Sequence, residues 1–326
     1  MLVKLYLLLL LLPLTFYAVG QGKSELTATE LLQKLIQFQS ISGNESEIGG
    51  FLKTYCEKKG LYTQLMSPHD SAYNFSASLY PLNSKKPNII FHSHLDVVPV
   101  TSETEWKQPP FSGNLINDTI WGRGAIDCKG LAVMQLTSLF DLVNLAKKRD
   151  LPYNVTFLGL SGEENGNPHG ANYVVNNYSN LLNPVVVFGE GGSGLTNLVP
   201  SKPHLPIFGI SVAEKSSLWL KLVAKKKTHG HGAVPPDLYA NKRLVKSLIK
   251  LLDQKRELKF DKTSKYMFKE LGTLEGGLRG FVIKHINWLI FWPFVKKHFR
   301  PGEIFNVLVK NTFVISEINT MSQGSV

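Results

Sequence analysis

The pattern of apolar and polar residues in the first part of the chain predicts an α/β sheet. Three short runs that are apolar almost throughout are typical of buried strands, at 88–91, 153–160 and 184–188. Segments with apolar residues at helical spacing precede and separate these runs, at 27–38, 48–59, 130–148 and 170–178. Two further segments, 61–66 and 73–79, are expected to be extended and paired. Strands that alternate with helices in this way favour a single sheet covered by helices.

The pattern changes after Pro206. Segments 207–212 and 218–223 predict a pair of antiparallel strands, and a long helix is expected at 238–252. A domain boundary is therefore expected near Ala213. Segment 281–299 is rich in aromatic residues and flanked by basic ones. It is interpreted either as a helix packed within the fold or as a surface that contacts a membrane or an acyl chain.

The N-terminal segment predicts a targeting signal. Lys4 precedes a leucine-rich stretch, 5–12, and small residues follow before Gly20. Residues 1–20 are thus expected to be a secretory signal peptide, with an uncleaved signal anchor as the alternative. The expected location is outside the cell or in the secretory-pathway lumen, or else on a membrane through this anchor. Asn-x-Ser/Thr sequons agree with a secreted glycoprotein, at Asn44, Asn74, Asn117, Asn154 and Asn177.

Charge and cysteine content narrow the class of protein. The two cysteines, Cys56 and Cys128, are too few for a disulfide scaffold, and their pairing is left open. The net charge is +11, and 21 basic against 8 acidic side chains fall between Ala213 and Lys310. These charges are interpreted as solvated helix faces, with an anionic ligand or lipid headgroup as the alternative. No nucleic-acid motif occurs, so no nucleic-acid partner is expected.

Polar residues follow each of the three buried runs. His92, His94 and Asp96 follow the first, the pair Glu163–Glu164 follows the second, and Glu190 follows the third. Asp127 stands in a glycine-rich turn before a helix. Imidazoles and carboxylates on neighbouring strand-end loops suit a divalent metal such as zinc. Of the paired glutamates, one could bind metal while the other transfers protons.

Four segments carry a resemblance to a known family. They are HSHLDVVP, WGRGAIDCKG, SGEEN and GEGG, in this order. They resemble the aminoacylase / carboxypeptidase S family of co-catalytic zinc metallopeptidases. PPFSG, VAEKSSLWL and HGHGAVPP are similar to its secreted N-fatty-acyl-amino-acid synthase/hydrolase branch. The resemblance implies an α/β, mixed-sheet zinc-peptidase catalytic domain, incomplete at 21–212. It also implies an inserted α+β lid/dimerisation domain, incomplete at 213–326, through which the chain would form a homodimer.

The resemblance also implies roles for single residues. His94 binds one zinc ion and Asp127, which a cis peptide bond commonly follows, bridges two. Glu164 and Glu190 each complete the shell of one ion. Asp96 orients the imidazole of His94.

The remaining roles concern proton transfer and the lid. Glu163 acts as general base and acid, and His231 is the lid histidine that stabilises the oxyanion, with His229 as an alternative. His92 is interpreted as a polar residue at a strand end. Cys128 is interpreted as a small buried neighbour of Asp127, with metal binding as the alternative.

One expected zinc ligand has no counterpart. In the family the catalytic domain resumes after the lid and supplies a last histidine, but only His285 and His298 follow His231 here. The second of two zinc ions is therefore expected to lack its usual imidazole. The chain is interpreted as a fragment or truncated gene product of a working enzyme, with a genuinely short, impaired product as the alternative.

The expected function is that of a metallo-carboxypeptidase or aminoacylase-type amidohydrolase. A metal-activated water would cleave an amide bond in small peptides, at the C-terminal residue, or in N-acyl amino acids. The alternative is a non-catalytic or metal-deficient binding protein on the same scaffold. Membrane contact is assigned to the N-terminal segment or to 281–299.

Overall fold

The chain divides into two units, Met1–Glu190 and Gly191–Val326. The computed structural model describes residues 25–68, 73–192, 194–216, 218–225, 237, 239–254, 257–288 and 309–319. The expected targeting segment 1–20 and His231 lie outside these residues. The expected catalytic domain at 21–212 and lid domain at 213–326 stay predictions.

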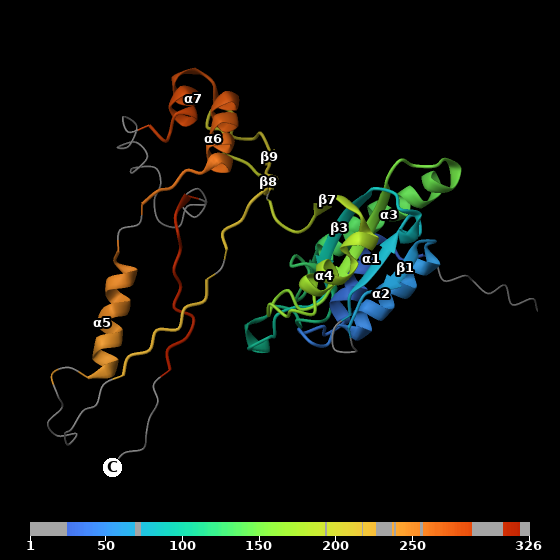
Figure 1. Ribbon diagram of the computed structural model, residues 1–326, viewed down its shortest axis with the longest axis horizontal. Coiled ribbons are helices and arrows are strands. Elements are labelled where there is room, and N and C mark those ends of the chain that lie inside the picture. The colour runs from blue at the N-terminus through green and yellow to red at the C-terminus, as the bar shows by residue number, and fades with distance from the viewer. Residues whose placement is uncertain are drawn as a thin grey trace, which may run out of the picture. The chain divides into compact units, whose positions relative to one another are not determined.

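The first unit is built on a five-stranded mixed sheet (Figure 1). Its strands, in spatial order, are β1 (Tyr62–Leu65), β2 (Phe75–Ser78), β6 (Asn154–Leu160), β3 (Asn88–His94) and β7 (Pro184–Phe188). β3 runs parallel to both β6 and β7, whereas β1–β2 and β2–β6 are antiparallel. The predicted α/β class and the three predicted buried runs are confirmed as strands of one sheet.

Helices cover both faces of this sheet. On one face, α1 (Ala28–Gln37), α2 (Ser46–Lys58) and α3 (Lys129–Lys148) share a core with Phe75, Ala77 and Phe157. On the other face, α4 (Ala171–Leu182) packs against Ile90, Leu158 and Leu160. β6 lies between these layers and is buried along its whole length. This explains why its sequence is largely apolar instead of alternating.

Local sequence features mark where two of these helices begin. Thr27 and Glu30 form a reciprocal capping box at the start of α1, as the sequence indicates. α3 begins directly after the glycine-rich turn that carries Asp127.

β7 lies at one edge of the sheet. It pairs with β3 alone among the described strands and exposes its apolar side chains, and Val185 is 56% exposed.

Short elements were missed by the apolar pattern. A hairpin forms from β4 (Asn114–Ile116) and β5 (Thr119–Trp121) between β3 and α3. Asn117 and Asp118 both adopt positive φ, 48° and 56°, which two-residue hairpin turns require. The apolar residues of these three-residue strands are too few to show a period. Two 3₁₀ turns, η1 (Leu82–Ser84) and η2 (Glu103–Glu105), complete the unit.

The second unit has three helices and one short strand pair among its described residues. These are α5 (Ala240–Leu252), α6 (Lys262–Glu275), α7 (Gly277–Lys284), β8 (Gly194–Leu195) and β9 (Ile207–Phe208). The expected helix at 238–252 is confirmed as α5. A small core joins Phe268, Ile286 and Val309. No helix in the described part of the chain is long and apolar enough to cross a membrane.

The predicted pairing of 207–212 with 218–223 is wrong. β9 pairs instead with β8, and the described residues of 218–225 have no regular structure. Trp219 is 83% exposed, so the apolar residues of this segment are not buried against a partner. A strand is stable only where one of its faces packs against another element. The apolar pattern of 218–223 does not by itself provide such an element. Segment 281–299 is described only as far as Trp288, where α7 and a turn occupy it.

The structure also limits two chemical predictions. Both cysteines are buried free thiols. Asn74 and Asn154 are 0% and 2% exposed, and their amides bond to backbone groups, so neither can carry a glycan in the folded protein. Asn44, Asn117 and Asn177 are exposed.

Replacement of Phe157 by alanine should destabilise the first unit strongly. Its ring is fully buried and lies 5.9 Å from that of Phe75 at the centre of the core. We expect a loss of about 3–5 kcal/mol in the free energy of unfolding, measured by chemical denaturation. Val175→Ala on the exposed side of α4 is the control, with an expected change within about 0.5 kcal/mol. Equal effects of the two substitutions would contradict this description of the core.

Candidate metal centre

Three parallel strands bring the candidate residues to one edge of the sheet. His94 is the last residue of β3 and pairs with Leu160, the last residue of β6. The loop after β6 carries Glu163 and Glu164, and Glu190 follows the end of β7. Because β6, β3 and β7 are adjacent and parallel, their carboxyl ends meet, as expected from the sequence.

His94, Asp127 and Glu190 form the centre of the site. Nε2 of His94 lies 2.9 Å from Oδ1 of Asp127 and 3.4 Å from Oε2 of Glu190. With the thiol of Cys128, their donor atoms lie within 4.8 Å of one another. The imidazole is 3% exposed, whereas the carboxylate of Asp127 is 67% exposed. The imidazole of the group is thus enclosed by the protein, whereas the carboxylate of Asp127 is open to solvent. The peptide bond Asp127–Cys128 is cis, as the resemblance implies.

The other ring nitrogen of His94 is held by Asp96. Nδ1 lies 2.9 Å from the backbone oxygen of Asp96 and 3.5 Å from its carboxylate. Nδ1–H therefore donates to Asp96, and Nε2 faces Asp127 and Glu190. A neutral imidazole with this tautomer presents its free lone pair to a metal.

The carboxylate of Asp96 also fixes the neighbouring loops. It is fully buried and accepts the hydroxyl of Ser42 at 2.8 Å. Its two oxygens accept the backbone N–H groups of Glu163 and Glu164, each at 3.1 Å. Asp96 thus orients His94 mainly through its backbone oxygen, and its carboxylate fixes the backbone position of both glutamates.

The site concentrates negative charge around one imidazole. Burial acts to lower the pKa of His94, but the side chains of Asp96 and Cys128 outweigh it and raise the pKa to about 12. Burial raises the pKa of Glu163 and of Glu164, and the surrounding carboxylates, including Asp127, raise both further. A cation is therefore strongly favoured here. One nitrogen, carboxylate oxygens and a sulfur are the ligands that zinc takes in proteins.

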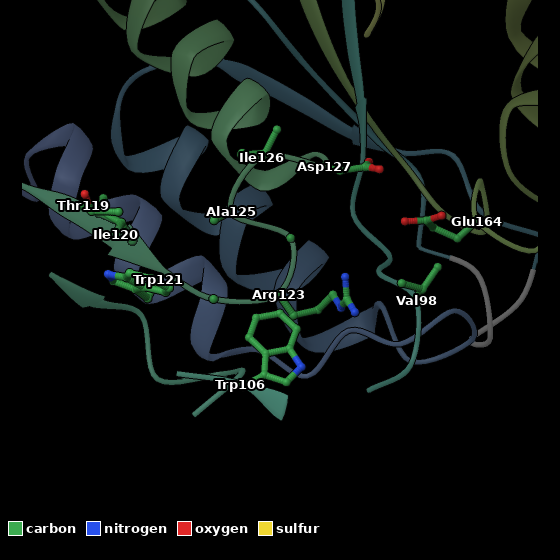
Figure 2. A pocket seen from close by; sticks show the side chains of 12 residues that line it. Val98, Trp106, Thr119, Ile120, Trp121, Arg123, Ala125, Ile126, Asp127 and Glu164 are labelled. Carbon is green, nitrogen blue, oxygen red and sulfur yellow. The ribbon is translucent and has the colours of Figure 1, made fainter. Parts of the chain in front are cut away.

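The paired glutamates are near this group but not part of it. Glu164 and Asp127 line the same pocket, as Figure 2 shows, whereas Glu163 is exposed. The structure thus brings together His94, Asp127 and Glu190, and places Glu164 beside them. Their roles as ligands, and those of Glu163 and Asp96 in catalysis, stay predictions. The predicted lid residue His231 is outside the described residues.

Two residues near the site, Ser42 and Glu45, were not anticipated from the sequence. Ser42 and Glu45 come from the loop after α1, far from every strand end in sequence. Glu45 is 2% exposed, one of its oxygens accepts the N–H of Gly43 at 3.0 Å, and burial raises its pKa. Cys128 is buried, and its sulfur lies 2.7 Å from Oγ of Ser93. It is therefore the expected buried neighbour, and its sulfur is also within the donor group.

Uptake of zinc by the metal-free protein should release protons. With a pKa of about 12, His94 is protonated at neutral pH and must lose a proton before Nε2 can bind a metal. We expect release of about one proton or more per ion, measured with an indicator dye, and an affinity that increases with pH. His94→Ala should lose both the tight binding and this release, whereas His204→Ala should retain them. Binding without proton release would contradict the assigned protonation of His94.

Cobalt can test whether Cys128 binds the metal. We expect the cobalt-loaded protein to show a thiolate-to-cobalt charge-transfer absorption, because the sulfur lies within the donor group. Cys128→Ser should remove this absorption, and Cys56→Ser should not, because Cys56 is buried in the core. If the absorption is absent from the unmodified protein, Cys128 serves as a packing residue against Ser93.

Comparisons with known proteins agree with this site. Residues 90–272 match the model of Peptidase family M20/M25/M40. "Probable carboxypeptidase S-like 1" of Dictyostelium discoideum is 36% identical over 166 residues, which are 50% of this chain and 33% of that protein. "Probable carboxypeptidase S-like 2" of the same organism is 26% identical over 320 residues, 93% of this chain and 59% of that protein. A "Succinyl-diaminopimelate desuccinylase" of Orientia tsutsugamushi (strain Boryong) is 31% identical over 135 residues, 41% of this chain and 34% of that protein.

Among solved structures, an M20 family metallo-carboxypeptidase, Sso-CP2 from Sulfolobus solfataricus, is 31% identical with a TM-score of 0.43. That match covers 51% of this chain and 37% of the other. The chain thus spans about a third of the length of two of these relatives and 59% of the third. The family model covers more than half of the chain and includes His94, Asp127, Glu163, Glu164 and Glu190. The chain therefore belongs to Peptidase family M20/M25/M40, which confirms the resemblance at the level of the family.

Proposed function

We propose that this chain carries the metal-binding core of a zinc-dependent hydrolase that cleaves amide bonds in small substrates. The observation that supports this most is the donor group of His94, Asp127 and Glu190 at the strand ends, in a chain of this peptidase family. The relatives named carboxypeptidase S-like and succinyl-diaminopimelate desuccinylase agree with amide hydrolysis. A non-catalytic binding protein on the same scaffold is the alternative.

In this proposal His94, Asp127 and Glu190 hold the first ion, with the sulfur of Cys128 from the same donor group as a further ligand. A bound divalent metal would lower the pKa of a water molecule and polarise the oxygen of the scissile carbonyl. Asp127 is proposed as the residue that would be shared with a second ion, because Glu164, the other proposed ligand of that ion, lines the same pocket. Two ions are proposed, the second held by Asp127 and Glu164.

Glu163 is proposed to move the proton. Its backbone is fixed by Asp96, its side chain is exposed beside the donor group, and its pKa is raised by burial and by neighbouring carboxylates. A glutamate whose pKa is raised holds a proton more readily, so it can accept one from the attacking water and then donate it to the leaving amine. His231 is proposed as a lid residue that stabilises the developing negative charge on the carbonyl oxygen.

The substrates and the cellular location that we propose are those predicted from the sequence. We propose peptides with a free C-terminus or N-acyl amino acids as substrates, secretion or residence in the secretory lumen, and a homodimer formed through the lid. Glycosylation is proposed only for Asn44, Asn117 and Asn177, because the other two sequon asparagines are buried. Hydrolysis of N-acyl amino acids compared with plain dipeptides distinguishes the two substrate classes. Activity on dipeptides alone would exclude the acyl class.

Glu163→Gln tests the proposed function. We expect kcat/KM for amide hydrolysis to fall about 10²–10⁴-fold, because general acid–base catalysis contributes about that much. Zinc content, measured by elemental analysis, should be unchanged because Glu163 is not among the proposed ligands. Glu103→Gln on the exposed turn η2 is the control and should retain full activity. A zinc-loaded protein whose activity is insensitive to Glu163→Gln would support the non-catalytic alternative.

A further inference from the structure

The loop after β6, residues 161–170, carries both paired glutamates and is closed on itself. Across it, Asn167 donates its backbone N–H to the carbonyl of Gly162 at 2.8 Å. A side chain at Gly170 would collide with the carbonyl oxygen of Ser161, so the two ends of the loop lie against each other. The groups that hold these two ends therefore determine where the glutamates stand.

Asn74 bonds to both ends of this loop. It immediately precedes β2, and because β2 runs antiparallel to β6, it lies beside the residues that follow β6. Its Oδ1 accepts the backbone N–H of Ser161 at 2.9 Å, and its Nδ2 donates to the backbone oxygen of His169 at 2.7 Å. One amide side chain thus ties the start of the loop to its end.

The side chain of Asn74 is itself held in place. It is 0% exposed, and its Nδ2 also lies 3.4 Å from the backbone oxygen of Met66. Its backbone N–H donates to Oγ of Ser67 at 2.7 Å, and its carbonyl accepts the N–H of Met66 at 2.7 Å. A flipped amide would place its nitrogen against the N–H of Ser161, so the hydrogen-bond pattern fixes its orientation.

Further hydrogen bonds hold the same loop. The backbone N–H of Tyr73 donates to Oγ of Ser161 at 2.7 Å. Asp96 accepts the backbone N–H groups of Glu163 and Glu164. The loop is therefore held at its ends by residues 73 and 74 and at its glutamates by Asp96. Buried polar networks whose members are all satisfied make the segments that they join rigid.

We infer that Asn74 is a positioning residue for Glu163, because it joins the two ends of the loop that carries this glutamate beside the metal ligands. This inference rests on the proposed function, because it concerns the group that moves the proton there. Asn74 is fully buried and bonded to backbone groups, so it acts through the loop and not on the substrate. A displacement of about 1 Å at a reacting group can lower a rate about 10²-fold, so the loop must be held closely.

Asn154 provides a matched control in the same sheet. It is also a buried asparagine, 2% exposed, whose Oδ1 accepts the N–H of Tyr80 at 3.1 Å and whose Nδ2 donates to the carbonyl of Tyr80 at 3.0 Å. It is the first residue of β6, at the end of the strand opposite to the loop. Asparagine-to-aspartate replaces a buried donor by an acceptor at either position, so both substitutions should destabilise the fold to a similar degree.

The test compares Asn74→Asp with Asn154→Asp in the full chain at saturating zinc. For Asn74→Asp we expect kcat for hydrolysis of N-acyl amino acids or dipeptides to fall roughly 10–100-fold with KM unchanged, because Glu163 is displaced. Backbone amide exchange in 161–167, measured by mass spectrometry, should become at least roughly tenfold faster because the loop opens more often. Asn154→Asp should leave kcat and this exchange unchanged.

Ser161→Ala is a milder variant of the same clamp. It removes the acceptor of the Tyr73 N–H without burying a charge, so it remains informative if Asn74→Asp does not fold. It should lower kcat and speed the exchange of the loop in the same direction by a smaller factor. An equal loss of kcat in the Asn74 and Asn154 variants, or unchanged loop exchange in both Asn74→Asp and Ser161→Ala, would overturn the inference.

Failure of the proposed function gives a different result. Faster loop exchange in Asn74→Asp, together with hydrolysis insensitive to Glu163→Gln, would retain Asn74 as the residue that holds the loop and reject the catalytic role of Glu163.

Discussion

The site depends on the hydrogen bonds that the buried carboxylate of Asp96 accepts. It receives a hydroxyl from the loop after α1 and two backbone N–H groups from the loop after β6, and it faces the imidazole at the end of β3. Burial raises the pKa of Asp96, but hydrogen bonds from His94 and Ser42 outweigh this, so the net shift is downward and the group stays ionised. Removing such a charge from water is costly unless every lone pair is used, and here three segments of chain provide the donors.

The fold supplies the rigidity that this arrangement requires. β6 is buried on both faces between α4 and the layer of α1, α2 and α3, and it carries the loop of Glu163 and Glu164. β3 lies beside it and ends at His94, two residues before Asp96. His94 and the loop of the paired glutamates are thus carried by the most enclosed strands of the unit, whereas Asp127, in the turn before α3, is 67% exposed and Glu190 follows the exposed strand β7. Sites on rigid elements keep their geometry better than sites on loops alone.

Charged and apolar side chains occupy different parts of the pocket at this centre. The carboxylates make a cation favourable, and a proton on His94 partly compensates their charge until a metal replaces it. Arg123 provides positive charge in the same pocket, which apolar side chains also line.

The sequence by itself determined the order of strands and helices, the α/β class, and most residues that stand at the strand ends. It could do so because buried strands and helices have distinct apolar periods, and because His94, Glu163 and Glu190 directly follow such strands. Only the tertiary structure decided that β6, β3 and β7 are neighbours, that Cys128 turns its sulfur into the donor group, and that Ser42 supports Asp96 from another loop. It also rejected the predicted pairing of 207–212 with 218–223, because β9 pairs with β8 and 218–223 forms no strand. Pairing between distant segments depends on what each can bury against, and a local pattern does not contain that information.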